Sequence, residues 1–325
     1  MTLSADIALE LGPLKLAATI TAPGDGITVL FGPSGSGKST ILSVLAGLRR
    51  ADRGDIRLGH HAVDKLPPHR RGIGLVFQDA RLFPHLSVRQ NIAYAWKRAP
   101  EQKRPAIEAV ASFFDIAAHL DRPVTNLSGG EKSRVALARA VAAAPDFLLL
   151  DEPFAALDGA RRRAFIQVLT DMHRNYRLPM MVVTHDIDDA AALATHLVAL
   201  KDGRVVAQGA FMDTCRAPQF QALLDTSDIG VAMPASSVRS AHGGRSLWLR
   251  ADHVLLASEE PRAISARNVL AGEVSAVIAE SEQSRLVELI TQSGIVLSRV
   301  TPEAVRDLSL APGKKAWALA KAHTL

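Results

Sequence analysis

A glycine-rich loop between an apolar run and a helical stretch is the first segment whose residues could perform chemistry. It fits the pattern G-x-x-x-x-G-K-[ST] and consists of Gly32, Pro33, Ser34, Gly35, Ser36, Gly37, Lys38, Ser39 and Thr40. Glycines let successive backbone N–H groups turn toward one phosphate, and a helix that starts behind them points its positive end at the same anion. Lys38 adds a full positive charge, and the Ser39 hydroxyl suits a Mg²⁺ ligand. The loop therefore predicts a site for the phosphates of a nucleotide.

Two carboxylates end a second apolar run. Residues 147–150 are Phe-Leu-Leu-Leu, and Asp151 and Glu152 follow them. A buried parallel strand delivers such residues to the carboxyl edge of its sheet, where ligands bind in α/β folds. Asp151 suits a role at Mg²⁺, and Glu152 could orient and deprotonate a water that attacks the γ-phosphate. Together with the phosphate loop, this pair predicts nucleotide hydrolysis.

The elements that must position these residues alternate between strands and helices. Short, largely apolar runs at residues 26–31, 147–150 and 180–183 predict buried strands, and residues 39–48 predict a helix. Ile107, Val110, Ala111 and Phe114 have helical spacing, as do the apolar residues of 165–172. Residues 197–200 and 205–207 flank a turn and predict a hairpin. Alternation of this kind implies an α/β fold with a largely parallel sheet.

The pattern changes after about residue 224. Residues 226–244 are rich in small and polar side chains, which is typical of a linker or a first peripheral strand. Short β-type runs follow at residues 274–278, 286–291 and 295–300, with turn residues at 293–294 and 312–313. We predict a small all-β domain here.

Composition limits the possible classes of protein. The chain has 325 residues, which favours about two domains. A net charge of +5 is too small to indicate nucleic-acid binding, and the single cysteine, Cys215, is consistent with a reducing compartment. Residues 1–30 lack the pattern of a signal peptide, and no apolar run has the roughly 18–20 residues needed to cross a bilayer. Any membrane part is therefore expected on another chain.

A short motif before the acidic strand identifies a family. Its residues are Leu127, Ser128, Gly129, Gly130 and Glu131. They resemble the signature of ABC-transporter ATPases, and the resemblance covers about residues 1–225. It implies that Gln78 is the glutamine that senses Mg²⁺ and the γ-phosphate, that Asp158 belongs to the D-loop (residues 156–158), and that His185 is the switch histidine.

The resemblance also implies a mechanism. Two copies of the chain form a homodimer that holds ATP and Mg²⁺ between the phosphate loop of one copy and the signature of the other. Ser39, Gln78 and Asp151 are the expected Mg²⁺ residues, and Glu152, His185 and Gln78 the catalytic ones. Residues 81–88 are expected to contact an integral membrane permease. Two departures are Glu131, where the wider family usually has glutamine, and the absence of Phe, Tyr and Trp from residues 1–30, where importers usually carry an adenine-stacking aromatic.

The tail resembles a small molybdate-binding domain, the molbindin or Mop type with an OB-like fold. The match begins at residues 264–270, Ile-Ser-Ala-Arg-Asn-Val-Leu, and continues loosely to residues 320–321. Residues 79–85 also resemble the molybdate importer group. A tetrahedral dianion needs hydroxyl or N–H donors and positive charge, which Ser265, Arg267 and Lys321 can supply. An alternative reading is that Arg267 only holds strands together in an oligomer.

These observations predict three segments: an ABC ATPase domain at residues 1–225, a linker with peripheral strands at 226–262, and a Mop-type domain at 263–325. The predicted function is ATP hydrolysis that powers molybdate import at the cytoplasmic face of the bacterial inner membrane. A periplasmic or surface molybdate-binding protein is an indirect partner, and no nucleic acid is expected. Alternatives are an importer ATPase for tungstate, sulfate or another cargo such as iron or polyamines, and an oxyanion sensor with secondary ATPase activity. A soluble ABC ATPase that acts on DNA or ribosomes is disfavoured, because such proteins typically fuse two ATPase halves or insert a coiled coil.

Overall fold

The computed structural model describes residues 1–155, 157–237 and 246–321, and their contacts define two units. Unit 1 comprises Met1–Asp186 and Ala194–Gly209, and unit 2 comprises Ile187–Leu193 and Ala210–Leu325. The three-segment division at residues 225 and 262 remains a prediction. None of the helices in the described ranges is long and apolar enough to cross a membrane.

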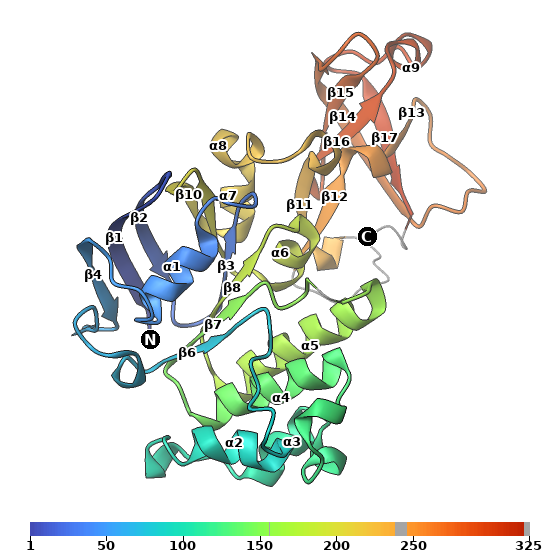
Figure 1. Cartoon of the computed structure of the whole chain (residues 1–325). Coiled ribbons are helices and arrows are strands. Elements are labelled where there is room, and N and C mark those ends of the chain that lie inside the picture. The colour runs from blue at the N-terminus through green and yellow to red at the C-terminus, as the bar shows by residue number, and fades with distance from the viewer. Residues whose placement is uncertain (156, 238–245, 322–325) are drawn as a thin grey trace. The chain divides into compact units, whose positions relative to one another are not determined.

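Unit 1 is built on a ten-stranded sheet with the order β5-β4-β1-β2-β10-β9-β3-β8-β7-β6 (Figure 1). Its strands are β1 (Leu3–Leu11), β2 (Leu14–Ala22), β3 (Ile27–Phe31), β4 (Arg53–Leu58), β5 (His61–Ala62), β6 (Ile73–Val76), β7 (Phe147–Asp151), β8 (Met180–Thr184), β9 (His196–Lys201) and β10 (Arg204–Ala210). The strands predicted near β3, β7, β8, β9 and β10 are all present.

The prediction of a largely parallel sheet holds for only one part of this sheet. Strands β9, β3, β8, β7 and β6 pair in parallel, whereas β1 pairs antiparallel with β2 and with β4, and β4 with β5. The sequence analysis missed β1 and β2. Their alternating inward residues, such as Leu3, Ala5 and Ile7 in β1, mark strands with one buried face. Antiparallel strands can be joined by a short turn, so no connecting helix in the sequence indicates their presence.

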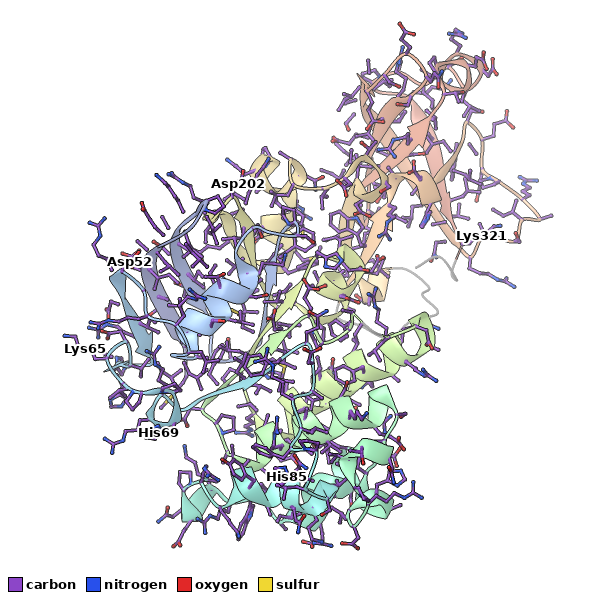
Figure 2. All side chains as sticks on the ribbon, viewed as in Figure 1. Asp52, Lys65, His69, His85, Asp202 and Lys321 are labelled. Atoms are coloured by element: carbon purple, nitrogen blue, oxygen red, sulfur yellow. The ribbon has the colours of Figure 1, made fainter. Side chains whose placement is uncertain are left out.

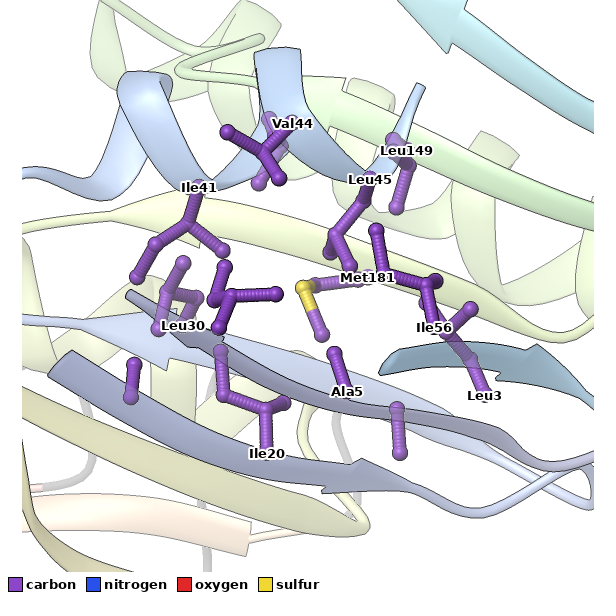
Figure 3. Packing of buried hydrophobic residues seen from close by; sticks show 14 of the residues in the cluster. Leu3, Ala5, Ile20, Leu30, Ile41, Val44, Leu45, Ile56, Leu149 and Met181 are labelled. Atoms are coloured by element: carbon purple, nitrogen blue, oxygen red, sulfur yellow. The ribbon is translucent and has the colours of Figure 1, made fainter. Parts of the chain in front are cut away.

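The helices of unit 1 match their predicted positions only in part: those expected from residues 39 and 107 begin within one residue of them, the one expected at 165–172 begins earlier, at Gly159, and the helix that begins at Val88 was not predicted. They are α1 (Lys38–Leu45), α2 (Val88–Trp96), α3 (Ile107–Phe113), α4 (Gly129–Ala142) and α5 (Gly159–Tyr176), with short 3₁₀ turns η1 (Pro68–Arg70), η2 (Glu101–Lys103), η3 (Ala117–His119) and η4 (Val124–Asn126). Helix α1 packs Ile41, Val44 and Leu45 into a core that includes Leu30 of β3 and Met181 of β8 (Figure 3). This packing holds the start of α1 against the carboxyl ends of the parallel strands.

Unit 2 contains two antiparallel sheets, β11-β12 and β13-β17-β14-β15-β16. Its elements are α6 (Ile187–Leu193), α7 (Phe211–Arg216), α8 (Pro218–Gln221), η5 (Thr226–Asp228), β11 (Gly230–Pro234), η6 (Ala235–Ser237), β12 (Ser246–Arg250), η7 (Ala251–His253), β13 (Leu255–Ala257), β14 (Asn268–Ala279), β15 (Arg285–Thr291), β16 (Gly294–Val300), α9 (Pro302–Asp307) and β17 (Lys315–Ala320). The prediction of an all-β tail is confirmed. Of the segment 226–244, residues 238–244 lie outside the described part.

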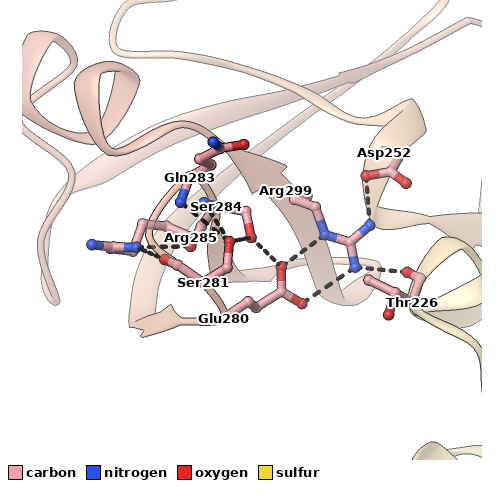
Figure 4. A network of polar contacts seen from close by, with 8 residues as sticks. All are labelled: Thr226, Asp252, Glu280, Ser281, Gln283, Ser284, Arg285 and Arg299. Atoms are coloured by element: carbon pink, nitrogen blue, oxygen red, sulfur yellow. Dashed lines mark hydrogen bonds and ion pairs between the residues drawn. The ribbon is translucent and has the colours of Figure 1, made fainter.

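An arginine network joins separate parts of unit 2 (Figure 4). Arg299 of β16 donates from Nε to Glu280 Oε2 at 2.7 Å and from Nη2 to Glu280 Oε1 at 3.2 Å. Its Nη1 also donates to Asp252 Oδ1 of η7, and its Nη2 to the Thr226 carbonyl oxygen of η5, each at 2.7 Å. The side chains of Arg299 and Glu280 are only 13% and 17% exposed, so little water competes for these bonds.

Replacing Arg299 with Met should destabilise unit 2 by about 2–4 kcal/mol, because it leaves the Glu280 carboxylate largely buried without its partner.

The Arg299 hydrogen bond holds the pKa of Glu280 below its ordinary 4.5. A lowered folded-state pKa stabilises the fold above the unfolded pKa, and this contribution is lost as the pH falls. Urea unfolding at neutral pH and near pH ~4 would measure both effects. Arg285→Met is the matched control, since within the described part of the chain Arg285 donates to the nearby carbonyl oxygens of Ser281 and Ser284. Equal stability of the two variants would contradict the prediction.

Candidate functional site

The loop between β3 and α1 has a backbone that requires glycine. Gly35 has φ 80°, and Gly37, the residue before α1, has φ 103°, both in the left-handed region. A Cβ at Gly32 would collide with the Leu200 carbonyl oxygen. These glycines therefore allow the loop to turn tightly in front of the N-terminus of α1, as the motif predicts.

Lys38 is the first residue of α1 and lies inside the loop. Lys38 is only 5% exposed. Its Nζ donates to the carbonyl oxygens of Gly32 at 2.7 Å and Pro33 at 2.8 Å. Burial lowers the pKa of Lys38, while the charges of Glu152 and Asp151 oppose that shift. The Ser36 hydroxyl is also buried and has no hydrogen-bond partner in the described part of the chain. A buried cation and an unsatisfied hydroxyl in one loop fit a phosphate.

Ser39 and Asp151 meet across the site. The Ser39 hydroxyl donates to Asp151 Oδ1 at 2.9 Å, although the two residues lie 112 positions apart. Burial raises the pKa of Asp151, and the Ser39 hydrogen bond works against that shift. A hydroxyl and a carboxylate side by side provide the hard oxygen ligands that Mg²⁺ prefers. The pair therefore fits the metal that the sequence predicts here.

Glu152 and His185 follow neighbouring parallel strands. Asp151 of β7 is in register with Val183 of β8, so both residues emerge at the same edge of the sheet. Glu152 Oε1 lies 3.6 Å from His185 Nδ1. Glu152 has φ 43°, a left-handed conformation that is costly for a residue other than glycine and that clusters at functional sites. The fold thus brings the predicted base and switch histidine together.

Gln78 lies at this same edge. Val76, the last residue of β6, is in register with Leu150 of β7, so Gln78, two residues after Val76, corresponds in position to Glu152, two residues after Leu150. Gln78 is exposed and lies in a bend after β6. The structure therefore places all the predicted hydrolysis residues at the carboxyl edge of the parallel strands.

The signature residues begin another helix. Ser128 is the N-cap of α4, where its hydroxyl accepts from the Glu131 N–H at 3.3 Å and Glu131 Oε2 accepts from the Ser128 N–H at 2.7 Å. This reciprocal capping box satisfies two N–H groups at the helix start.

The D-loop leads into α5. Asp158 is the N-cap of that helix, and its carboxylate accepts from the Arg161 N–H at 3.0 Å. Ala156, the first residue of the predicted D-loop, lies outside the described residues. The sequence analysis missed the ion pair between Arg162 and Asp186, whose Nη1 and Oδ2 atoms are 2.5 Å apart. This pair joins α5 to Asp186, the residue after His185. In the sequence, the aspartate directly after the switch histidine could have indicated this ion pair.

Residues 81–88 are held by a buried asparagine that the sequence analysis also missed. Asn91 of α2 is 0% exposed. Its Oδ1 accepts from the Phe83 N–H at 2.9 Å, and its Nδ2 donates to the carbonyl oxygens of Phe83 at 3.2 Å and Ser87 at 3.0 Å. Figure 2 labels His85, which lies in this segment. A cavity of about 310 Å³ beside it is lined by Phe77, Arg81, Phe83, Tyr94, Arg98 and Arg139, among others.

The three predicted molybdate residues lie at one end of the larger sheet of unit 2. Asn268 of β14 pairs with Ala320 of β17. Arg267 and Lys321, each one residue beyond this pair, therefore lie at the same end of neighbouring antiparallel strands; Figure 2 labels Lys321. Ser265 precedes Arg267 by two residues, and all three residues are exposed.

Comparison with characterised proteins identifies the family. The chain is 38% identical to the molybdenum import ATP-binding protein ModC of Thiobacillus denitrificans, over 95% of this chain and 94% of that protein. It is also 38% identical to ModC 1 of Azotobacter vinelandii, over 95% and 94%, and 33% identical to ModC of Rhizobium etli, over 100% and 99%. The chain belongs to the ModC family of ABC-transporter ATPases. The model of the ABC transporter family matches residues 17–155, and that of the TOBE domain matches residues 264–325.

Solved structures agree with this membership. CbiO1 of Clostridium perfringens, part of the ABC transporter complex cbiONQ, covers 65% of this chain with 26% identity and a TM-score of 0.56, and 89% of that chain is covered. The ATP-binding cassette MJ0796, solved as a dimer in a post-hydrolysis state with ADP and Pi, covers 65% with 25% identity and a TM-score of 0.57, and 99% of that chain is covered. The ModC family member described here therefore has the ABC ATPase fold and is an ATP-binding ABC ATPase.

Proposed function

We propose that the chain hydrolyses ATP to power molybdate import, as the energy-coupling subunit of an ABC transporter. The observation that carries the ATPase part is the contact of Ser39 with Asp151, next to Lys38 and to the pair of Glu152 and His185. It assembles residues from three separate parts of the sequence into one hydrolytic site. The cargo follows from the names of the relatives, which are molybdenum import ATP-binding proteins.

Each residue of the site has a role in this proposal. The phosphate-loop N–H groups and Lys38 bind the phosphates, and the positive end of α1 adds to this attraction. Ser39, Asp151 and Gln78 would hold Mg²⁺, which neutralises charge on the phosphate oxygens. Glu152 orients a water and accepts its proton as the water attacks the γ-phosphate. His185, next to Glu152, contacts the γ-phosphate and reports its loss.

We infer that two copies complete the site. The start of α4 presents the N–H groups of Gly129 and Gly130, and apart from the helix's own backbone no atom of the described residues lies within 4 Å of where a Cβ of either glycine would be. Such a helix start attracts an anion, and the γ-phosphate bound by a second copy is the expected one. Leu127 to Glu131 would thus act across the dimer, with Asp158 nearby in the D-loop.

The segment 81–88 and the cavity beside it are the proposed contact with an integral membrane permease. Arg81 lies over the Phe77 ring at 3.7 Å, and Arg98 lies over the Tyr94 ring at 3.7 Å. Tyr94 is 43% exposed, so an aromatic surface is open to a partner. The chain would then sit at the cytoplasmic face of the inner membrane and meet a molybdate-binding protein only through the permease.

The tail is proposed to bind molybdate and regulate transport. Arg267 and Lys321 place two positive charges at one sheet end, and Ser265, two residues before Arg267, carries a hydroxyl; these are the groups that a tetrahedral dianion needs. This assignment corresponds to the predicted Mop-type segment at residues 263–325.

Calorimetric titration of the purified protein with molybdate tests the tail, with sulfate as the control anion. We expect molybdate but not sulfate to bind, and Arg267→Ala to weaken binding at least about tenfold through loss of a charged hydrogen-bond donor. Arg262→Ala, which removes an exposed arginine just before this segment, is the matched control. Absence of molybdate binding by the unaltered protein would contradict a molybdate-binding role of the tail. The transported substrate would then have to be identified by an uptake assay.

A further inference from the structure

The carboxylate of Glu131 has two donors at the start of α4. Oε2 accepts from the Ser128 N–H at 2.7 Å, and Oε1 lies 3.1 Å from Nε2 of His119. His119 ends η3 (Ala117–His119), a turn that precedes the signature in the sequence. The two side chains are 22% and 32% exposed, so this contact is partly shielded from water.

The chemistry of this contact determines the state of the imidazole ring. An ionised carboxylate only accepts hydrogen bonds, so Nε2 of His119 must carry the proton. Nδ1 of His119 is buried and has no partner among the described residues. A ring with its hydrogen on Nδ1 and none on Nε2 would leave a buried N–H without an acceptor and two acceptors facing each other, which is costly. The surroundings of His119 therefore favour a hydrogen on Nε2, directed at Glu131.

The carboxylate itself stays ionised in this setting. The hydrogen bonds from Ser128 lower the pKa of Glu131 most, and the charges of His119 and Arg122 add to the effect. The other charged groups around the adjoining cavity of about 290 Å³ are Asp115, Arg134 and Arg161. Asp115 and Arg134 pair with each other at 2.9 Å.

We propose that His119 is a positioning residue for the signature: its Nε2–H holds Glu131 so that the capping box with Ser128 keeps the first N–H groups of α4 aimed outward. This inference rests on the proposed function, in which those N–H groups bind the γ-phosphate on a second copy. His119 does not touch ATP in this arrangement. It acts only through Glu131 and Ser128.

One consequence concerns the residue type at position 131. A glutamine there would face two donors, the Ser128 N–H and the His119 Nε2–H, with only one oxygen. Its NH₂ group would then either oppose a donor or force the His119 proton onto Nδ1, where it has no acceptor. Glu131→Gln is therefore expected to raise KM for ATP in this protein, although glutamine is the usual residue of the wider family at this position.

The test measures steady-state ATP hydrolysis for His119→Leu, His119→Gln, Glu131→Gln and the double variant His119→Leu/Glu131→Gln. We expect His119→Leu and Glu131→Gln each to raise KM for ATP about five- to tenfold, with a smaller change in kcat. His119→Gln should recover most of the loss, because its side-chain amide can donate to Glu131. The double variant should be no worse than the poorer single variant, as expected for residues that act as one unit.

Asp115→Asn is the matched control. It removes a charge from the same cavity, and asparagine tolerates the positive φ of 55° at this position. KM should be unchanged in this variant. Unchanged KM in His119→Leu, or multiplicative effects in the double variant, would overturn the proposal.

A second readout does not depend on turnover. Nitrogen-15 NMR of the histidine rings, with His119→Gln for assignment, should show His119 protonated at Nε2 in the unaltered protein. A ring with its hydrogen on Nδ1 and none on Nε2 would overturn the inference even if the protein were inactive. Lack of Mg²⁺-dependent hydrolysis by the unaltered protein would instead contradict the proposed function, so the two failures are distinguishable.

Discussion

Replacing Glu152 with Gln is expected to lower the rate of ATP hydrolysis by about 10²–10⁴-fold, which is the usual contribution of a general base, while ATP remains bound. Glutamine keeps the shape of the side chain but cannot accept the proton of the attacking water. Glu152 also lies 3.6 Å from His185 and adopts a left-handed backbone with φ 43°. Such strain persists where the surrounding structure fixes a functional geometry.

Single-turnover hydrolysis and nucleotide binding should be measured on the same Glu152→Gln preparation. Glu10→Gln serves as the control, because Glu10 is an exposed residue of β1. We expect the control to hydrolyse ATP normally. Normal turnover of Glu152→Gln would exclude Glu152 as the base and direct attention to another group at the same sheet edge.

Replacing Lys38 with Met should lower kcat/KM for ATP by at least about 10²-fold, the effect typical of losing one preorganised charge at a phosphoryl or oxyanion site. The Lys38 ammonium donates to Gly32 and Pro33 within the loop, where its burial lowers the pKa of the group. Without a bound phosphate, burying the Lys38 charge costs free energy. Methionine has a similar length and no charge, so this replacement should not destabilise the nucleotide-free protein.

Two measurements separate binding from folding in the Lys38→Met variant. ATP titration should show lost affinity, while the thermal unfolding temperature without nucleotide should be unchanged or higher. Lys65→Met, which alters an exposed lysine, is the control and should bind ATP normally. Retained ATP affinity in Lys38→Met would show that the loop backbone alone binds the phosphates.

Local patterns account for what could be predicted of the fold. Residues 180–183 are a continuous apolar run and residues 26–31 are largely apolar, and they correspond to β8 and β3, whose residues are all buried. The turn between β9 and β10 was visible because Asp202 and Gly203 suit positive φ, and the structure has φ 47° and 76° there. Strands β1 and β2 were missed because three of their eight buried inward residues are alanines, which weakens the apolar signal.

The sequence by itself determined the chemistry of the phosphate loop, because Gly32, Gly37 and Lys38 act through their own backbone and side chains over a few consecutive residues. It also indicated the carboxylates Asp151 and Glu152, since a buried strand must end where its apolar run ends. Only the tertiary structure decided which distant groups meet them. Ser39 reaches Asp151 through strand order and the packing of α1.

Tertiary structure also decided the contacts that no sequence motif indicated. His119 meets Glu131, Arg162 meets Asp186, and Arg299 meets Glu280 through the folding of separate elements. A hydrogen bond depends on distances of a few tenths of an ångström and on direction. Residue spacing along the chain carries no such information, so these partners could be found only after the chain was folded.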